Sequence, residues 1–370
     1  MLAQLNAQGA SDAQKYAAVK RFLNFKARDK GIPLFGTFEL TPLCNLDCKM
    51  CYVHLNKDQM NGANLLTTDQ WKHIIDEAVK AGMMYARLTG GECLTYPGFK
   101  DVYLYLLEKG IEVSILSNGL LLNEEMIAFL KKHRPADIQI TLYGASEAAY
   151  EAVTGVRAFH VVAENIRRVV DAEIALTIAV TPSEYMKDGT EIIRYLHSEG
   201  LNFAVNAGLM TPRKETGRDL AGVNLASYIE MLKLQRSLKG KETDNVIDPE
   251  SLPDPGSAKI ESAKGVRCGA GRSGFSIDWK GQMRPCNTFP CEPVSVFELG
   301  FTEAWKITNH TANNYPLPQE CEGCTYKSIC KHCVAEHASG APCGHANPSI
   351  CEWAKTMVSE GLLKLQPVEI

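Results

Sequence analysis

The sequence has no long run of apolar residues. No stretch reaches the ~18 consecutive apolar residues that a membrane-spanning helix requires. The N-terminus, MLAQLNAQGASDAQKY, also lacks the apolar segment of a signal peptide. These two absences predict a protein that neither spans a membrane nor is secreted, and they favour a cytoplasmic location.

The sequence also lacks a strong charge of either sign. It carries 39 Lys and Arg against 43 Asp and Glu, for a formal net charge of −4. Binding to nucleic acid or to an anionic membrane surface depends on an excess of positive charge, so neither partner is expected. The 370 residues are enough for one large globular domain and a smaller one.

Cysteine is absent from residues 94–267, although the chain contains 13 cysteines. Three lie between positions 44 and 51, one is Cys93, and nine lie between positions 268 and 351. A reducing cytoplasm disfavours structural disulfides, so dense cysteine there is more typical of metal sites. The wide gap predicts separate metal sites in separate parts of the chain.

Apolar, β-branched segments alternate with amphipathic helical patterns. The expected strands are residues 35–41, 85–89, 112–117, 137–143, 175–181 and 202–209. The expected helices are residues 67–81, 98–109, 123–133, 160–172, 188–199 and 222–238. Six strand–helix units predict a parallel sheet covered by helices, and six are too few to close a TIM barrel. The predicted fold class is therefore α/β, an open partial (β/α)6 barrel with a small C-terminal cysteine-rich domain.

Four regions are expected along the chain. They are an N-terminal helical segment (1–33), the partial barrel (34–240), a charged linker with three prolines (241–264) and the cysteine-rich domain (265–370). Residues 12–30 are predicted to form a basic helix, which either packs on the main domain or lies on a partner or membrane surface. The last region is expected to begin with a β-hairpin around Lys280-Gly281.

Polar residues and cysteines follow the first four expected strands. They are Cys44, Cys48 and Cys51 after the first strand, Gly90-Gly91-Glu92 after the second, Ser117-Asn118 at the third, and Thr141 at the fourth. The carboxyl ends of parallel strands meet at one rim, so these residues are expected to lie together. Three thiolates on one loop can hold three irons of a four-iron cluster and leave the fourth open to a small molecule. A zinc ion completed by His54 is the alternative.

The cysteine loop after the first strand and the Gly-Gly-Glu after the second, in this order and spacing, resemble the radical S-adenosylmethionine (SAM) superfamily over residues 35–210. The resemblance implies that Cys44, Cys48 and Cys51 ligate a [4Fe–4S] cluster whose open iron binds SAM. It also implies that reductive cleavage of SAM yields a 5′-deoxyadenosyl radical, which abstracts hydrogen from a substrate. The implied SAM contacts are Gly90, Gly91, Glu92, Ser117, Asn118, Thr141 and Tyr52.

Some of these positions have other interpretations, and some depart from the family pattern. Ser117, Asn118 and Thr141 are equally well explained as strand-end turn and capping residues. Cys93 stands where proline is common; it could return a hydrogen atom to a substrate radical, or it could simply be a small loop residue. Thr154 stands where many relatives carry an arginine, for which Arg157 is the available substitute.

The C-terminal cysteines resemble the SPASM extension of radical SAM enzymes, which holds two auxiliary [4Fe–4S] clusters. The resemblance assigns Cys321, Cys324, Cys330 and Cys351 to an outer cluster and Cys268, Cys286 and Cys333 to an inner one. Cys291 or Cys343 could supply the eighth ligand; if neither does, the inner cluster has an open iron that could hold substrate. Two zinc sites are the alternative.

The resemblance implies an anaerobic oxidoreductase or maturase that modifies a ribosomally made peptide or protein by crosslinking, thioether formation or epimerisation. A small electron donor such as flavodoxin or ferredoxin is the implied partner. Formylglycine formation is not expected, because Asn287 stands where sulfatase-maturating enzymes carry a catalytic Asp, and an amide cannot act as a base.

Two other functions stay open. The same chemistry could act on a small molecule such as a sugar nucleotide, amino acid or tetrapyrrole, for which Arg213, Lys214 and Arg218 could form a basic rim. That basic run could equally be solvated or paired with neighbouring acidic residues. The remaining alternative is a zinc-binding scaffold without enzymatic activity.

Overall fold

The computed structural model describes residues 11–206, 211–219, 222–239, 265–327, 329–330 and 333–364. The expected linker at 241–264 lies outside the described residues, as do positions 207–209 of the sixth expected strand. The proposed domain boundaries therefore stay predictions.

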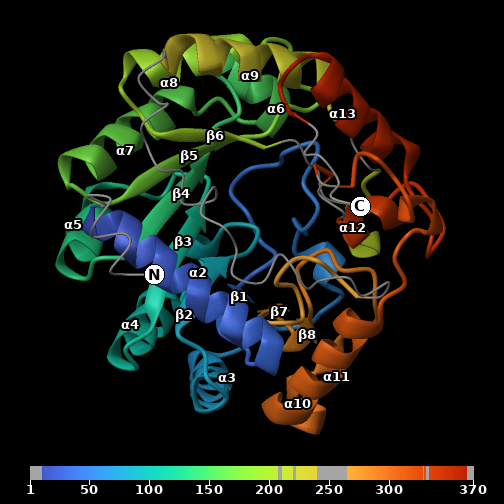
Figure 1. The fold of residues 1–370 in the computed structure, drawn as a ribbon. Helices are drawn as coiled ribbons and strands as arrows, with labels where there is room; N and C mark the ends of the chain where they lie inside the picture. The colour runs from blue at the N-terminus through green and yellow to red at the C-terminus, as the bar shows by residue number, and fades with distance from the viewer. Residues whose placement is uncertain are drawn as a thin grey trace.

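Within the described residues, nine strands form one sheet in the order β6-β5-β4-β3-β2-β1-β7-β8-β9. The first six run parallel: β1 (Phe35–Glu39), β2 (Tyr85–Thr89), β3 (Glu112–Ser117), β4 (Asp137–Thr141), β5 (Leu176–Val180) and β6 (Phe203–Val205). Figure 1 shows these strands following one another around a curved sheet with helices outside. The predicted α/β partial barrel of six parallel strands is confirmed.

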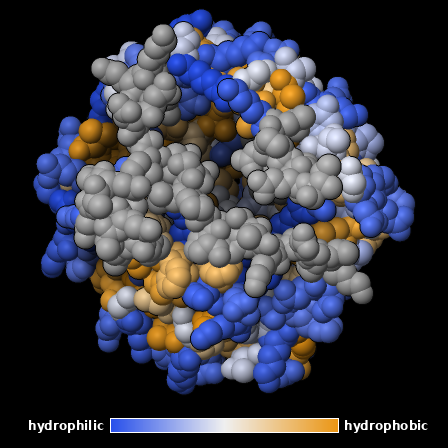
Figure 2. Space-filling view, viewed as in Figure 1, coloured by the Kyte–Doolittle hydropathy of each residue, from blue (hydrophilic) through white to orange (hydrophobic). Residues whose placement is uncertain are grey.

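The covering helices are α3 (Thr68–Lys80), α4 (Phe99–Glu108), α5 (Glu124–Lys132), α7 (Phe159–Asp171), α8 (Gly189–Ser198) and α9 (Leu225–Lys239). Their apolar sides face the sheet, where Trp71, Tyr103 and Ile166 are almost completely buried. Hydrophilic residues cover most of the outer ring of helices on the face shown in Figure 2, as expected for amphipathic helices. A further helix, α6 (Glu147–Thr154), was not predicted because its eight residues are too few for a clear period.

The expected hairpin forms, but it belongs to the barrel sheet. Strand β7 (Gly274–Ile277) pairs in parallel with β1, and β8 (Gln282–Arg284) and β9 (Val294–Ser295) follow in antiparallel order. The turn is fixed by Asp278, whose carboxylate accepts hydrogen bonds from the backbone of Lys280 and Gln282. The hairpin therefore brings the cysteine-rich region directly against the first barrel strand.

The remaining helices of the cysteine-rich region are α10 (Val296–Leu299), α11 (Phe301–Asn314), α12 (Val334–Ala338) and α13 (Pro348–Ser359). Figure 1 places α10 and α11 beside β7 and β8, whereas α13 lies next to α9 and β6, where Met357 packs with Tyr228. None of the helices in the described part of the chain is both long and apolar enough to cross a membrane.

The N-terminal helix α2 (Asp12–Lys30) packs across the starting ends of the strands. A capping box at Ser11 begins it, and Gly31 in the left-handed conformation ends it. Lys20 pairs with Glu112, the first residue of β3, at 2.7 Å, and Ala27 packs with Tyr85, the first residue of β2. This confirms the packed-helix interpretation, and it places α2 away from the carboxyl ends of the strands.

Candidate active site

A cavity of about 480 Å³ lies at the carboxyl ends of the parallel strands. Thr89, Ser117 and Thr141 end successive strands on its wall, and Thr181 and Asn206 directly follow β5 and β6. The other expected residues on its wall are Cys48, Cys51, Tyr52, Gly90, Gly91, Glu92 and Asn118. The expectation that these segments meet at one rim is confirmed. A carboxylate that sequence reasoning missed, Glu336 of α12, also lines the cavity.

The three thiols of the first cysteine loop lie close together. Burial raises the pKa of Cys44 to about 12, and the charges of Glu92 and Cys51 add to the effect. Burial raises the pKa of Cys48 as well, with further contributions from Cys51 and Cys44. The thiols are therefore near enough to act on one another, in a place that disfavours free thiolates.

N–H groups point at the sulfur atoms of this loop. Cys44 Sγ accepts from the backbone of Leu46 at 3.4 Å and from Asn118 Nδ2 at 3.6 Å. Cys51 Sγ accepts from the backbone of His54 at 3.3 Å. A bound iron deprotonates a ligating thiol, and donors placed at sulfur stabilise the resulting thiolate. Three clustered thiols with N–H donors already aimed at them fit an iron–sulfur cluster.

The alternative zinc site has less support. His54, the suggested fourth zinc ligand, directs Nδ1 toward Asp47 at 3.4 Å and Arg218 at 3.5 Å. Within the described ranges, no three His, Cys, Asp or Glu side chains are grouped as a single metal ion would need.

Helix α6 holds the cysteine loop in place. The backbone N–H groups of Asp47 and Lys49 donate to the carbonyls of Thr154 and Val153 at 3.0 and 3.1 Å. Thr154 is fully buried and its hydroxyl donates to the Tyr150 carbonyl at 2.8 Å. Thr154, which stands where many relatives carry an arginine, is thus the last residue of α6, the helix that supports the cysteine loop.

Arg157 does not replace that arginine. Its side chain is 65% exposed and pairs with Glu151 on the surface of α6 at 3.1 Å. It is not part of the cavity wall. The expectation that Arg157 takes over a SAM contact is wrong, because the chain directs it outward after Gly155 closes α6 in the left-handed conformation.

Gly90 and Gly91 pack against the start of the cysteine loop. A Cβ on Gly90 would lie 2.4 Å from the Thr41 carbonyl, and one on Gly91 would lie 2.4 Å from the Leu43 carbonyl. The backbone N–H groups of Gly91 and Glu92 donate to these same two carbonyls at 2.7 and 2.9 Å. Glycine is therefore required at both positions because the backbone after β2 lies in contact with the backbone of the cysteine loop.

Glu92 joins the end of β2 to the end of β3. Its carboxylate is 1% exposed and accepts from the backbone of Asn118 at 2.7 Å and from the Ser117 hydroxyl at 3.0 Å. Burial raises the pKa of Glu92, while these hydrogen bonds oppose the rise. Ser117 and Asn118 also accept from backbone N–H groups of the following turn. Their role as strand-end turn residues is confirmed, and their contact with SAM stays a prediction.

Cys93 does not face the cavity. Its side chain is fully buried, and Sγ donates to the Leu116 carbonyl at 3.3 Å. Burial raises the pKa of this thiol well above its usual value, and the Glu92 charge adds to the rise. The expectation that Cys93 lies on the rim facing a substrate radical is wrong, because the thiol points into the core of the barrel wall.

Asn287 links the cysteine loop to the C-terminal hairpin. Its Nδ2 donates to the Tyr52 hydroxyl at 3.2 Å, and its Oδ1 accepts from Ser276. Burial raises the pKa of Tyr52 to about 12, so the phenol stays neutral. Because Tyr52 follows Cys51 and Asn287 follows Cys286, this bond connects two of the expected ligand positions.

Arg213 belongs to the same network and not to a substrate-facing rim. Its guanidinium binds both oxygens of Glu39, at 2.6 and 2.9 Å, and donates to the Asn287 carbonyl at 3.3 Å. Glu39 is fully buried; burial raises its pKa and the Arg213 charge opposes the rise. The interpretation of Arg213 as part of a basic, phosphate-complementary rim is wrong.

Two further groups of thiols form in the C-terminal region. Burial raises the pKa of Cys321, and Cys330, Cys351 and Cys324 raise it further, so these four lie together. Burial raises the pKa of Cys286 to about 11, with contributions from Cys268 and Cys333. The SPASM resemblance implies the same four-plus-three grouping, and the roles of these cysteines as cluster ligands stay a prediction.

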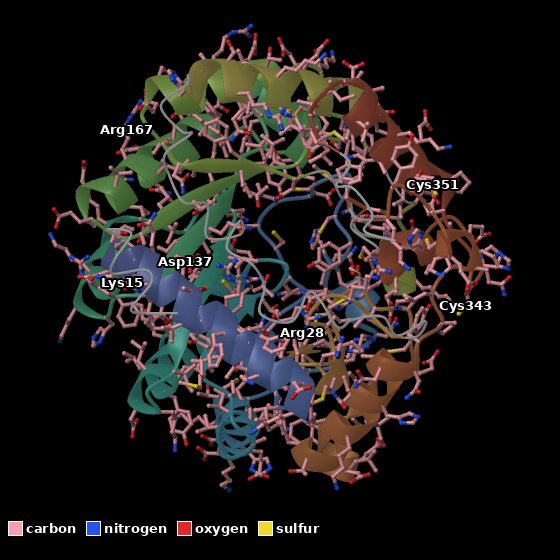
Figure 3. All side chains as sticks on the ribbon, in the orientation of Figure 1. Lys15, Arg28, Asp137, Arg167, Cys343 and Cys351 are labelled. Carbon is pink, nitrogen blue, oxygen red and sulfur yellow. The ribbon has the colours of Figure 1, made fainter. Side chains whose placement is uncertain are left out.

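Cys291 and Cys343 gather around Tyr315. Cys343 Sγ donates to the Tyr315 hydroxyl at 3.7 Å. Burial raises the pKa of Tyr315, and Cys343 and Cys291 act in the same direction. Burial raises the pKa of Cys291 to about 11, and this side chain packs with Cys286 against one apolar cluster. Figure 3 shows Cys343 and Cys351 on the same side of the molecule, far from Arg167 of α7.

Known proteins with similar sequences support the assignment of this cavity as a radical SAM active site. Residues 38–196 match the sequence model of the Radical SAM superfamily. The chain is 24% identical over 354 residues to the antilisterial bacteriocin subtilosin biosynthesis protein AlbA of Bacillus subtilis, covering 90% of this chain and 74% of AlbA. It is 25% identical over 334 residues to the AdoMet-dependent heme synthase of Methanosarcina barkeri, covering 82% and 91%.

Solved structures share the fold. Streptococcus suis SuiB bound to its precursor peptide SuiA superposes with a TM-score of 0.66 at 16% identity, over 90% of this chain and 79% of SuiB. The enzyme anSMEcpe with bound AdoMet superposes with a TM-score of 0.66 at 15% identity, over 89% and 93%. Residues 38–196 therefore form a radical SAM domain. The protein is a radical SAM enzyme related to SPASM-type, peptide-modifying maturases.

Proposed function

We propose that this enzyme cleaves SAM reductively at a [4Fe–4S] cluster held by Cys44, Cys48 and Cys51, and that the resulting radical modifies a peptide or protein. The observation that carries the proposal is the cavity, in which the cysteine loop, the Gly-Gly-Glu turn and the polar ends of β3 to β6 meet. The likeness to a bacteriocin biosynthesis protein and to a fold that binds a precursor peptide supports the substrate class.

When bound, the cluster and SAM supply the electron and the carbon radical. The protein provides the ligands and the surrounding hydrogen bonds. Backbone N–H groups at Cys44 and Cys51 compensate the charge of the thiolates, and Glu92 keeps Asn118 against the cysteine loop. Met50, Val53, Leu116 and Ala179 make part of the cavity wall apolar, which limits water near a reactive radical.

We infer that the four thiols around Cys321 hold an outer auxiliary cluster and that the three around Cys286 hold an inner one. Cys343 binds the Tyr315 hydroxyl, and Cys291 packs with Cys286 against one apolar cluster, so the inner set offers three thiolates, or four where Cys291 joins it. An open iron there would hold a substrate thiolate or another donor group. Among the peptide modifications, thioether formation and crosslinking fit this arrangement better than epimerisation, whose expected hydrogen donor is buried.

The heme synthase relative favours one second candidate, the same radical chemistry on a small molecule such as a tetrapyrrole. A phosphate-bearing small molecule has less support. The side chains of Arg213 and Arg218 contact Glu39 and Asp47 and are not directed at the cavity.

The test is iron content and SAM cleavage. Anaerobic reconstitution should load about twelve irons, from three four-iron clusters. Changing Cys44, Cys48 and Cys51 together to Ala should remove about four of them and abolish 5′-deoxyadenosine formation with dithionite. SAM cleavage that survives this triple change would overturn the assignment. The matched control is Cys343→Ala, which should leave SAM cleavage intact.

A further inference from the structure

A segment beyond the part matched by the family, residues 211–219, folds over the cysteine loop; we call it the strap. The backbone N–H of Arg213 donates to the Tyr52 carbonyl at 3.0 Å. Gln59 Nε2 donates to the Thr216 carbonyl at 3.0 Å. The strap is thus hydrogen-bonded to residues on both sides of His54, and its two arginines both point inward.

Arg218 reaches the middle of the loop. One nitrogen of its guanidinium donates to the backbone carbonyl of Cys48, and the other pairs with the carboxylate of Asp47. The Arg218 side chain is 21% exposed, whereas that of Asp47 is 70% exposed. Water therefore screens the carboxylate more than the guanidinium, so the guanidinium acts more strongly on the loop than its partner does.

A fixed positive charge at this place has an electrochemical consequence. Adding an electron to an iron–sulfur cluster adds one negative charge, which a nearby cation stabilises. Arginine keeps its charge at every pH at which proteins are studied. The hydrogen bond to the Cys48 carbonyl also fixes the backbone of the central ligand position, as outer groups around metal ligands commonly do.

We propose that Arg218 is a positioning residue that sets both the conformation of the cysteine loop and the reduction potential of the cluster bound there. The proposal rests on the function proposed above, because it requires a cluster at Cys44, Cys48 and Cys51. It assigns the strap to the electron-accepting step and gives the basic run a role other than substrate binding.

The test is a redox titration without SAM. The electron paramagnetic resonance signal of the reduced cluster measures how much of the cluster is reduced at each potential. Variants that lack Cys321 and Cys286 isolate the signal of the first cluster. In that background Arg218→Gln keeps a donor for the Cys48 carbonyl but removes the charge. Its ratio of reduced to oxidised cluster at a fixed potential should fall about tenfold, which is about 59 mV for one electron.

Two other variants keep the test decisive. Asp47→Asn removes the opposing charge, so the ratio should rise. Arg218→Lys keeps the charge and should leave the ratio within about twofold of the parent. Arg157→Gln, at a surface pair on α6, is the matched control and should change nothing. If Arg218→Gln does not assemble a cluster, the other two variants test the proposal. An unchanged ratio in Asp47→Asn, or a large fall in Arg218→Lys, would overturn the role of Arg218.

Different outcomes separate this inference from the proposed function. A first cluster that forms in these variants with an unchanged ratio overturns the role of Arg218 and leaves the proposed function standing. A cluster signal and SAM cleavage that persist in the triple cysteine variant overturn the proposed function itself.

Discussion

At position 93 the thiol packs behind the cavity wall, not in the cavity. It belongs to the main apolar core and contacts the carbonyl of Leu116 on β3. Its neighbour Glu92 faces the cavity, so the direction of the side chain changes within one residue of the turn. The chemical identity of a residue next to a catalytic motif therefore says little about whether it takes part in the reaction.

We expect Cys93→Ala to form normal amounts of 5′-deoxyadenosine and product. Its free energy of unfolding should fall by about 1–2 kcal/mol at pH 7, because a small apolar group is removed from the core. Chemical denaturation of the apo-protein measures this loss. A variant that is stable but makes no product would contradict the buried, structural role.

The stability difference between the parent and Cys93→Ala depends on pH, and its sign follows from the pKa of the thiol. Burial raises the pKa of Cys93 above the usual 9.0, so the thiol is neutral in the folded state while the unfolded thiol ionises near pH 9. The stability that it contributes is fully present below pH 9 and is lost as the pH rises above it. The advantage of the parent over Cys93→Ala should therefore shrink from pH 8 to pH 10. Cys93→Val, which keeps the volume, should show the same trend against the parent.

At the scale of elements, the cysteine loop is held from three sides. Carbonyl groups of helix α6 accept hydrogen bonds from it, the Gly90-Gly91 turn packs against its start, and the hairpin β7–β8 reaches it through Asn287. The Tyr52–Asn287 hydrogen bond is the contact that couples the loop to the hairpin. Loss of one partner leaves a partly buried polar group unsatisfied, which costs up to about 1–3 kcal/mol.

We expect Tyr52→Phe and Asn287→Ala each to destabilise the apo-protein by about that amount, and the double variant to be less than additive. A double-mutant cycle by chemical denaturation should give a coupling energy of about 0.5–3 kcal/mol. Tyr195→Phe is the matched control, because its buried hydroxyl has no hydrogen-bond partner among the described residues. Strict additivity of the first pair would show that the loop and the hairpin are independent.

At the scale of the whole molecule, the cysteine-rich region and the barrel share one sheet. Strand β7 pairs with β1 over four residues of each, from Phe35 opposite Gly274 to Phe38 opposite Ile277. The inner group lies close to this junction through Cys286, whereas the outer group lies in later segments, with Cys351 on α13. A change at the outer group should therefore leave the sheet and the cavity intact.

We expect Cys321→Ala to lose about four irons and to loosen the segment around it, because metal ligation supplies much of the folding energy of small metal-binding regions. SAM cleavage should persist but become uncoupled from product formation. Hydrogen exchange should show faster exchange in α13 and unchanged protection in β1 and β7. Unchanged iron content with full turnover would contradict an outer cluster.

Most of the barrel was predictable from the sequence, because short buried strands and amphipathic helices leave periodic patterns. Strands β2 and β3 begin and end at the predicted residues, 85–89 and 112–117. The cysteine spacing and the Gly-Gly-Glu motif predicted where the cavity would lie. These features depend on neighbours within a few positions in the chain, so local sequence determines them.

The partners of individual side chains were decided only by the tertiary structure. Arg213 meets Glu39 across 174 positions of sequence, and Arg218 meets the Cys48 carbonyl across 170. Likewise, β7 joins the barrel at β1, and Cys343 meets the hydroxyl of Tyr315 across 28 positions. A local pattern specifies backbone conformation and which residues tend to be buried. It does not specify which distant group satisfies a buried charge or thiol, because that depends on the packing of segments far apart in the chain.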